Sequence, residues 1–278
     1  MPKDTDTSTD SPPEGPSPRI LSPAQVREAL SRHRTWLDSG GSDGERALLA
    51  GANLNRADLE RARLKDADLY EATLSGARLQ GADLRGARLQ RAKLYQANFR
   101  GADLEDADLS GSSLQNTVLQ GANLKNANLE PADLELADLS GANLSGAHLR
   151  RANLQGVNLR DAILEAADLR RVRLREGNLP KADLQGANLR GADLRDANLQ
   201  NADLRRANLQ SAKLQNADMV QARLEDANLR KANLQKADLY KADLRNADLR
   251  GADLRNAVGI TSKTLDPAQT DDTTRLRD

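Results

Sequence analysis

A five-residue repeat runs through residues 52–256 without an insertion or a deletion. With the central position of each unit at 54, 59 and so on to 254, there are 41 units, and the centre is Leu in 39 of them. The residue two before the centre is Ala in 36 units, and Asp or Asn lies between the two in 29. The two positions after the centre vary among mostly polar residues. A repeat this regular must determine the fold, because every unit needs the same way to bury its Leu.

The five-residue period excludes a simple helix or strand. In an α-helix five residues advance about 500°, so successive Leu residues would spiral around the whole circumference. In a straight strand, residues five apart point to opposite faces. A unit that combines a short extended piece with a turn lets every Leu face one axis, and Asp and Asn suit such turns because they tolerate left-handed geometry and bond to nearby backbone. We therefore predict a chain that coils around an axis, with neighbouring laps about 4.8 Å apart.

The A-[DN]-L-x-x pattern resembles the pentapeptide-repeat family, and the resemblance covers about three quarters of the chain. The resemblance implies an all-β fold: a right-handed quadrilateral β-helix with four pentads in each lap and Leu filling the axis. The repeat would then form about ten coils and a rod roughly 50 Å long. The periodicity alone does not give the number four.

A capping helix is predicted before the repeat. Ser22, followed by Pro23 and, three residues after Ser22, Gln25, is a capping box with Pro at the first helical position. An amphipathic helix of about fifteen residues follows and stops at Gly40 and Gly41. Because a solenoid exposes an apolar cross-section at each end, we expect this helix to cover the N-terminal end.

These signals divide the chain into five segments. The polar composition of both termini predicts disorder there. The predicted segments are a disordered tail at 1–19, a capping helix with its lead-in at 20–46, the β-helix at 47–257, a closing turn at 258–265 and a second disordered tail at 266–278.

One part of the repeat is irregular. Little more than one lap contains five departures from the pattern: Val157, Ile163, Val172, Gly177 and Pro180. Because Pro cannot donate to a ladder between laps, one interpretation is a kink or bulge in the rod. The other is drift of the repeat without structural consequence.

Composition restricts the classes of function. The chain has 41 basic and 41 acidic residues, so it has no overall attraction to nucleic acid or to an anionic membrane. It has no cysteine, which excludes disulfides and thiolate metal sites. The first residues are polar and acidic, and no apolar run is long enough to span a bilayer. We therefore expect a cytoplasmic protein without a membrane partner.

The repeat does not predict catalysis. Asp precedes the centre in 16 units, but Asn takes the same place in 13, so the position does not require a charge and does not indicate a metal site. Catalysis needs irregular loops that converge on a pocket, and a regular rod does not offer them. We predict that the protein is not an enzyme and binds no cofactor or metal.

One surface column is enriched in arginine if a lap has twenty residues. Arg follows the centre in 13 of the 41 units, but in five of the six at positions 150, 170, 190, 210, 230 and 250. Charges stacked about 4.8 Å apart repel by roughly 1 kcal/mol per pair even in water, so the arrangement does not stabilise the fold. The hypothesis is that these residues and their neighbours dock an acidic partner; the alternative is a solvated stripe produced by repeat duplication. The predicted site comprises Arg150, Arg151, Arg170, Arg171, Arg190, Arg230, Lys231 and Arg250.

We therefore predict a non-enzymatic, protein-binding scaffold or adaptor, a monomer or weak dimer whose partner is another protein with an acidic surface, with DNA as a second candidate. An alternative comes from the family resemblance, since some pentapeptide-repeat proteins imitate DNA and bind type II topoisomerases, protecting them from quinolones. Such mimicry requires a broadly acidic face, which the neutral charge balance does not favour. A third possibility, a filament formed by end-to-end stacking, conflicts with the predicted N-terminal cap.

Overall fold

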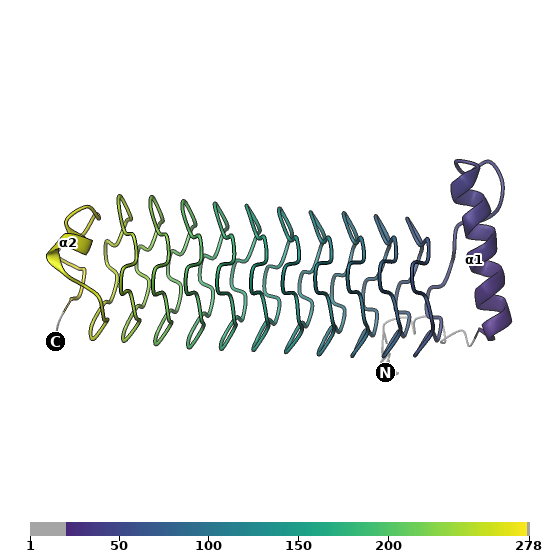
Figure 1. The fold of residues 1–278 in the computed structure, drawn as a ribbon, viewed down its shortest axis with the longest axis horizontal. Helices are drawn as coiled ribbons and strands as arrows, with labels where there is room; N and C mark the ends of the chain where they lie inside the picture. The colour runs from purple at the N-terminus through teal and green to yellow at the C-terminus, as the bar shows by residue number, and fades with distance from the viewer. Residues whose placement is uncertain (1–20, 277–278) are drawn as a thin grey trace, which may run out of the picture.

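The computed structural model describes residues 21–276, which form one long rod (Figure 1). Helix α1 (Pro23–Asp38) lies across the N-terminal end, and the single-turn helix α2 (Ser262–Leu265) lies at the C-terminal end. Between them the chain winds in successive laps in which each pentad contributes one bridge residue and no long strand forms. The tail predicted at 1–19 lies outside the described residues.

Each lap contains four pentads. Parallel β-bridges join residues twenty apart, from Leu48 with Asp68 in the first laps to Asp238 with Val258 in the last. This register confirms the coil predicted from the period and the lap of four that the family resemblance implied. The ordinary spacing between strands then places successive laps about 4.8 Å apart.

In a pentad with Asp or Asn before the centre, all five backbone N–H groups can be hydrogen-bonded. In one mid-rod unit the Asn143 N–H donates to the preceding lap (2.9 Å), and the N–H groups of Leu144 and Gly146 donate to the following lap (2.6 and 2.9 Å). The Ala142 N–H donates within its own lap at 3.0 Å. The fifth N–H, of Ser145, has the Oδ1 atom of Asn143 as its acceptor at 3.0 Å. Asp or Asn before the centre therefore accepts the one donor that no backbone carbonyl reaches.

This pattern decides between a kink and simple drift in the irregular region. The bridges keep their offset of twenty there, with Asn158 paired to Asn178 and Ile163 to Asp183. Pro180 directly follows a centre, where an N–H would bond to a side chain and not to another lap. The missing N–H of Pro180 therefore removes no hydrogen bond between laps. The irregularity is drift of the repeat and not a kink.

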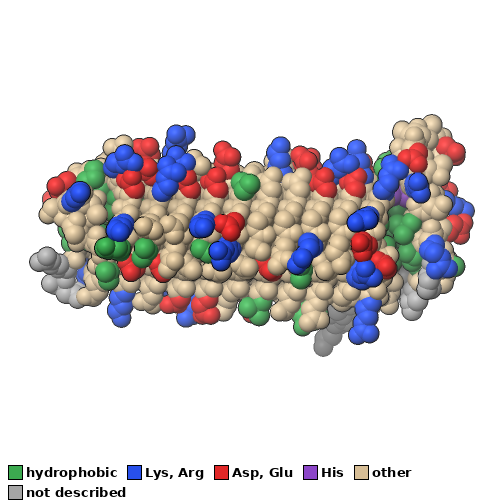
Figure 2. All heavy atoms as spheres, in the orientation of Figure 1, with side chains coloured by type: hydrophobic (Ala, Val, Ile, Leu, Met, Phe, Trp, Pro, Cys, Tyr) green, Lys and Arg blue, Asp and Glu red, His purple; other side chains and the backbone are tan. Residues whose placement is uncertain are grey.

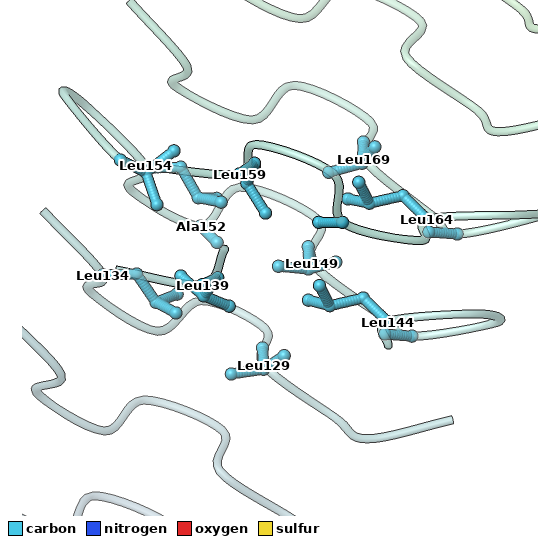
Figure 3. Packing of buried hydrophobic residues seen from close by; sticks show 14 of the residues in the cluster. Leu129, Leu134, Leu139, Leu144, Leu149, Ala152, Leu154, Leu159, Leu164 and Leu169 are labelled. Atoms are coloured by element: carbon cyan, nitrogen blue, oxygen red, sulfur yellow. The ribbon is translucent and has the colours of Figure 1, made fainter. Parts of the chain in front are cut away.

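The repeat centres form the core. Every centre from Leu49 to Leu254 is at most 3% exposed. Residues twenty apart stack along the axis, as Leu129, Leu149 and Leu169 do in Figure 3. Burial of each Leu contributes about 1.5 to 3 kcal/mol before chain entropy is subtracted.

Helix α1 begins with the capping box that the sequence predicts. The Ser22 Oγ accepts the Gln25 N–H at 3.3 Å, and the Gln25 Oε1 accepts the Ser22 N–H at 2.8 Å. Val26, Ala29 and Leu30 pack against the end of the Leu core. The helix therefore covers the apolar cross-section of the first lap.

His33 joins this cap to the rod. Its side chain is fully buried, its Nδ1 accepts the Ala47 N–H at 3.1 Å, and its ring stacks on Trp36 with centroids 5.5 Å apart. Ala47 is the first buried residue of the β-helix. An Nδ1 that accepts a hydrogen bond is unprotonated, so this contact requires the neutral ring.

The surroundings of His33 favour that neutral form. Burial lowers the pKa of His33, and the nearby charges of Arg63 and Arg46 lower it further. The Lys65 carbonyl and the Asp66 carboxylate oppose the shift without reversing it.

The C-terminal residues differ from the predicted tail at 266–278. The Leu249 N–H donates to the Gln269 carbonyl at 2.8 Å, and the Leu254 N–H donates to the Arg275 carbonyl at 2.7 Å. The offset there grows to 21 residues at Gln269 and then to 22 at Arg275. The polar composition of this segment does not predict its order, because the last full lap needs backbone carbonyls as acceptors. A residue with any side chain can supply them.

We expect Leu144→Asp to lower the free energy of unfolding by more than about 3 kcal/mol, because it places an unpaired charge in the Leu core. Thermal melting followed by circular dichroism measures the effect. The adjacent Asn143→Asp is the control and should melt like the native chain, since Asp keeps the acceptor for Ser145. An unchanged melting temperature for Leu144→Asp would contradict the inward position of the centre.

We expect the cap to loosen in mild acid. Because the folded pKa of His33 lies below its ordinary value of about 6.5, the unfolded form takes up the proton first as the pH falls. The stability that His33 contributes is present above about pH 6.5 and is lost as the pH falls toward the folded pKa. Trp36, the only Trp of the chain, reports the change by its fluorescence.

The fluorescence transition should persist in His148→Asn, which changes the other, exposed His, and disappear in His33→Leu. A flat profile between about pH 8 and 5 in the native chain would refute the role of His33.

Candidate functional site

The structure brings the predicted basic residues together on one side of the rod. The bridge residues of this side run in register from His148 through Asp168 to Asp248. Neighbouring rows are joined directly, since the N–H groups of Arg151 and Arg171 donate to carbonyls of the next row at 3.0 Å. We call this surface the arginine face; it comprises Arg150, Arg151, Arg170, Arg171, Arg190, Arg230, Lys231 and Arg250.

The backbone places these side chains in two adjacent columns. Residues directly after the centre form one column, and residues two after the centre form the other. The second column has positive φ at every lap of the face, for example 59° at Arg151, 56° at Arg171 and 68° at Gly191. Left-handed geometry is least costly for Gly, because the Cβ atom of any other residue crowds the backbone there.

A hollow of about 430 Å³ opens within the arginine face. The second column changes from long side chains at Arg151 and Arg171 to Gly191 and then to Ser211, and this change leaves the space. The lining residues are Arg150, Arg151, Arg170, Arg171, Arg190, Gly191 and Ser211.

Half of the basic residues of the face have a carboxylate partner. The Arg150 Nε donates to Glu130 at 2.6 Å, and the Arg170 guanidinium forms a two-pronged pair with Asp168. Arg250 forms the same kind of pair with Asp248. Arg230 lies 3.9 Å from Asp248 as well.

These pairs keep the carboxylates ionised. Hydrogen bonding from Arg170 lowers the pKa of Asp168, and hydrogen bonding from Arg250 lowers the pKa of Asp248. The charges of Arg170 and Arg250 are therefore partly satisfied within the protein.

The other half has no such partner. Among residues 21–276, Arg151, Arg171, Arg190 and Lys231 form no ion pair, and all four are exposed. With eight basic side chains against four carboxylates, of Glu130, Asp168, Asp248 and Asp271, the arginine face has an excess of four positive charges on a chain whose net charge is zero.

Sequence reasoning missed three members of this site. Glu130 stands twenty residues before Arg150, so the lap of twenty is the signal that identifies it. Gly191 and Ser211 interrupt the second basic column and belong to the lining of the hollow. Their effect depends on the removal of side-chain volume between flanking arginines, which a search for charged residues overlooks.

The remaining surface of the described chain offers little alternative chemistry. Within residues 21–276, no group of three or more His, Asp or Glu side chains is arranged to hold a metal ion. In the same part of the chain, neither helix is long and apolar enough to cross a membrane. Figure 2 shows basic and acidic side chains mixed along the side of the rod that it displays.

The model of the family of pentapeptide repeats matches eight times, at residues 45–81, 67–106, 102–141, 132–171, 167–206, 187–226, 207–246 and 222–258. A search of curated proteins gave no match.

Solved structures of pentapeptide-repeat proteins are similar to the chain. HetL, a pentapeptide repeat protein involved in heterocyst differentiation regulation from the cyanobacterium Nostoc sp. strain PCC 7120, is 33% identical over 86% of this chain and 93% of its own, with a TM-score of 0.45. QnrB1, a plasmid-mediated fluoroquinolone resistance protein, is 18% identical over 68% of this chain and 90% of its own, with a TM-score of 0.44. A pentapeptide repeat protein of the Arabidopsis thaliana thylakoid lumen is 29% identical over 37% of this chain and 69% of its own, with a TM-score of 0.22.

The family model spans most of the chain, and its five-residue unit is the one that the bridges repeat four times in each lap. The chain therefore belongs to the pentapeptide-repeat family and has the right-handed, four-sided β-helix of that family.

Proposed function

We propose that the protein is a non-catalytic scaffold that binds a protein partner with an acidic surface through the arginine face. The observation that carries this proposal is the excess of four positive charges on one side of a chain without net charge. Stacked cations of like sign destabilise a fold, so their concentration favours a role outside the fold.

The partner that fits this surface is acidic and extended along the rod. The basic rows at 150, 170, 190, 230 and 250 cover five lap spacings, or about 24 Å. Arg171 and Lys231 extend into solvent without a carboxylate partner among the described residues and can form new charge-assisted hydrogen bonds.

The hollow supports the non-catalytic part of the proposal. Its lining provides the hydroxyl of Ser211 and guanidinium groups but no histidine or carboxylate to act as a general base. A hydroxyl without a base is a hydrogen-bonding group and not an activated nucleophile.

DNA mimicry is the weaker candidate. The densest acidic pentad contains Asp103, Glu105 and Asp106. Arg85 lies 3.5 Å from Asp103, and Lys125 lies 3.8 Å from Glu105. Basic side chains so close to the acidic ones do not favour the continuous negative surface that mimicry requires.

The test compares two variants with the same change of charge. The face variant replaces Arg151, Arg190, Arg230 and Lys231 with Gln, and the control variant replaces Arg61, Arg100, Lys181 and Arg206, which are exposed basic residues on other sides. We expect the native and control proteins to retain from native lysate a partner that the face variant loses, and we expect high salt to release it. Partners identified by mass spectrometry should then bind as purified proteins with the same order of affinity.

Neither variant should melt below the native chain, because every replaced side chain is exposed. Equal retention of the same acidic partner by all three proteins would refute the arginine face as the docking surface.

A further inference from the structure

The positive charge of the hollow is concentrated and only partly balanced. Five guanidinium groups line it, from Arg150, Arg151, Arg170, Arg171 and Arg190. Those of Arg150 and Arg170 are held by carboxylates, whereas the other three have no ion pair among the described residues. The hollow therefore presents three unbalanced positive charges.

The three free groups come from neighbouring laps. The rows at 150, 170 and 190 are consecutive laps, so they span about 10 Å along the rod. The lining also supplies the Ser211 hydroxyl, and Gly191 leaves room beside Arg171, whose Cγ lies 3.7 Å from the position that a Cβ on Gly191 would take. A ligand in this space meets several donors at once.

The charge and number of these donors fit a phosphate monoester better than a carboxylate. A carboxylate carries one charge and two acceptor oxygens. A phosphorylated side chain carries a charge of about −1.5 to −2 and three strong acceptor oxygens, and guanidinium groups bind such oxygens in pairs. Three free guanidinium groups therefore supply enough donors for the three oxygens of one phosphoryl group.

A long polyanion is a poorer match. The basic rows are interrupted at Gln210, and Ser211 stands beside it in the second column. A nucleic-acid backbone presents phosphates continuously and gains affinity from each cation along its path. The compact cluster followed by a neutral row favours a single phosphoryl group over a continuous strand of them.

The face continues beyond the neutral row with a second basic cluster. Arg230 and Lys231 lie two laps beyond Arg190, at a distance of about 10 Å along the rod. Three residues of an extended peptide cover about the same distance. An acidic residue three positions from a phosphorylated one would therefore lie over Arg230 and Lys231.

We propose that the hollow binds a phosphorylated serine or threonine side chain of the protein partner, with an acidic residue three positions away bound at Arg230 and Lys231. This inference rests on the proposed function and specifies the partner: it is a phosphoprotein. The adjacent second cluster supports a peptide over a free phosphate, because a small anion occupies the hollow alone and gains nothing from the second cluster.

The experiment measures binding of labelled peptides to the full chain by fluorescence anisotropy. The probes contain pSer-Ala-Ala-Glu, Glu-Ala-Ala-pSer, Ser-Ala-Ala-Glu or Glu-Ala-Ala-Glu between identical neutral flanks. We expect at least one phosphopeptide to bind about tenfold or more tightly than both unphosphorylated peptides. Equal affinities for the phosphorylated and unphosphorylated peptides would overturn the inference.

Two triple variants locate the site. Arg151, Arg171 and Arg190 changed to Gln should abolish the preference for phosphate, while Arg61, Arg100 and Arg206 changed to Gln should keep it. The variants are matched, because each set has two residues with positive φ and one directly after a centre, and Gln96 and Gln221 already adopt that geometry in this chain. The same loss in both variants would mean non-specific attraction and would overturn the site.

A double variant, Arg230→Gln with Lys231→Gln, should bind the better phosphopeptide more weakly but keep its preference for that peptide over the unphosphorylated ones. Inorganic pyrophosphate serves as a competitor, and if it binds as tightly as the better phosphopeptide, the hollow is a small-anion site and the phosphoprotein proposal is wrong.

If the phosphopeptides show no preferred binding while the lysate partner still depends on the arginine face, only this inference is refuted. If the face variant also retains the lysate partner as well as the native chain does, the proposed function is refuted too.

Discussion

The hydrogen bonds between laps twenty residues apart are the interaction on which the rest of the structure depends. They fix the register so firmly that drift of the repeat at Val157, Val172 and Pro180 leaves it unchanged. Where Asp or Asn precedes the centre, its side-chain oxygen also accepts the single N–H that lies outside the ladder, as Asn143 does for Ser145. Because the ladder is made by backbone atoms, the Leu side chains are free to fill the axis and the other positions are free to vary.

This freedom explains why charge can gather on one side. Elsewhere on the rod many basic side chains pair with carboxylates from the same or a neighbouring row, as Arg205 and Arg223 do with Asp203. Such exposed pairs add little stability, but they neutralise the surface locally. The arginine face departs from this arrangement at Arg151, Arg171 and Arg190, where the rows supply more cations than carboxylates. The surplus lies where Gly191 and Ser211 remove side-chain volume, so charge and shape coincide.

Much of this architecture could be predicted from the sequence. The period places Leu144 and its equivalents inside, and Ser22 with Gln25 marks the start of the cap, because both signals are local rules of backbone geometry. The columns of the arginine face also follow from the sequence, but only once the lap is known, and the lap length depends on how four turns close around the axis. The pairing of Arg275 with the last lap was not predictable, since the ladder there uses backbone atoms of residues whose side chains are polar. The contact of His33 with Ala47 was not predictable either. It joins the helix to the rod, and the repeat carries no information on how the helix lies against the rod.

The regular lap makes the angular position of any surface residue a matter of arithmetic. Four units complete one turn, so an insertion or deletion of one unit between α1 and Arg150 would rotate the arginine face by about a quarter turn relative to the cap while leaving the core and the ladder intact. A change of four units would slide the face along the axis by about 4.8 Å without rotation. Gain and loss of whole units is therefore a route by which a rod of this kind can re-aim a binding surface toward a different neighbour without acquiring any new core residue.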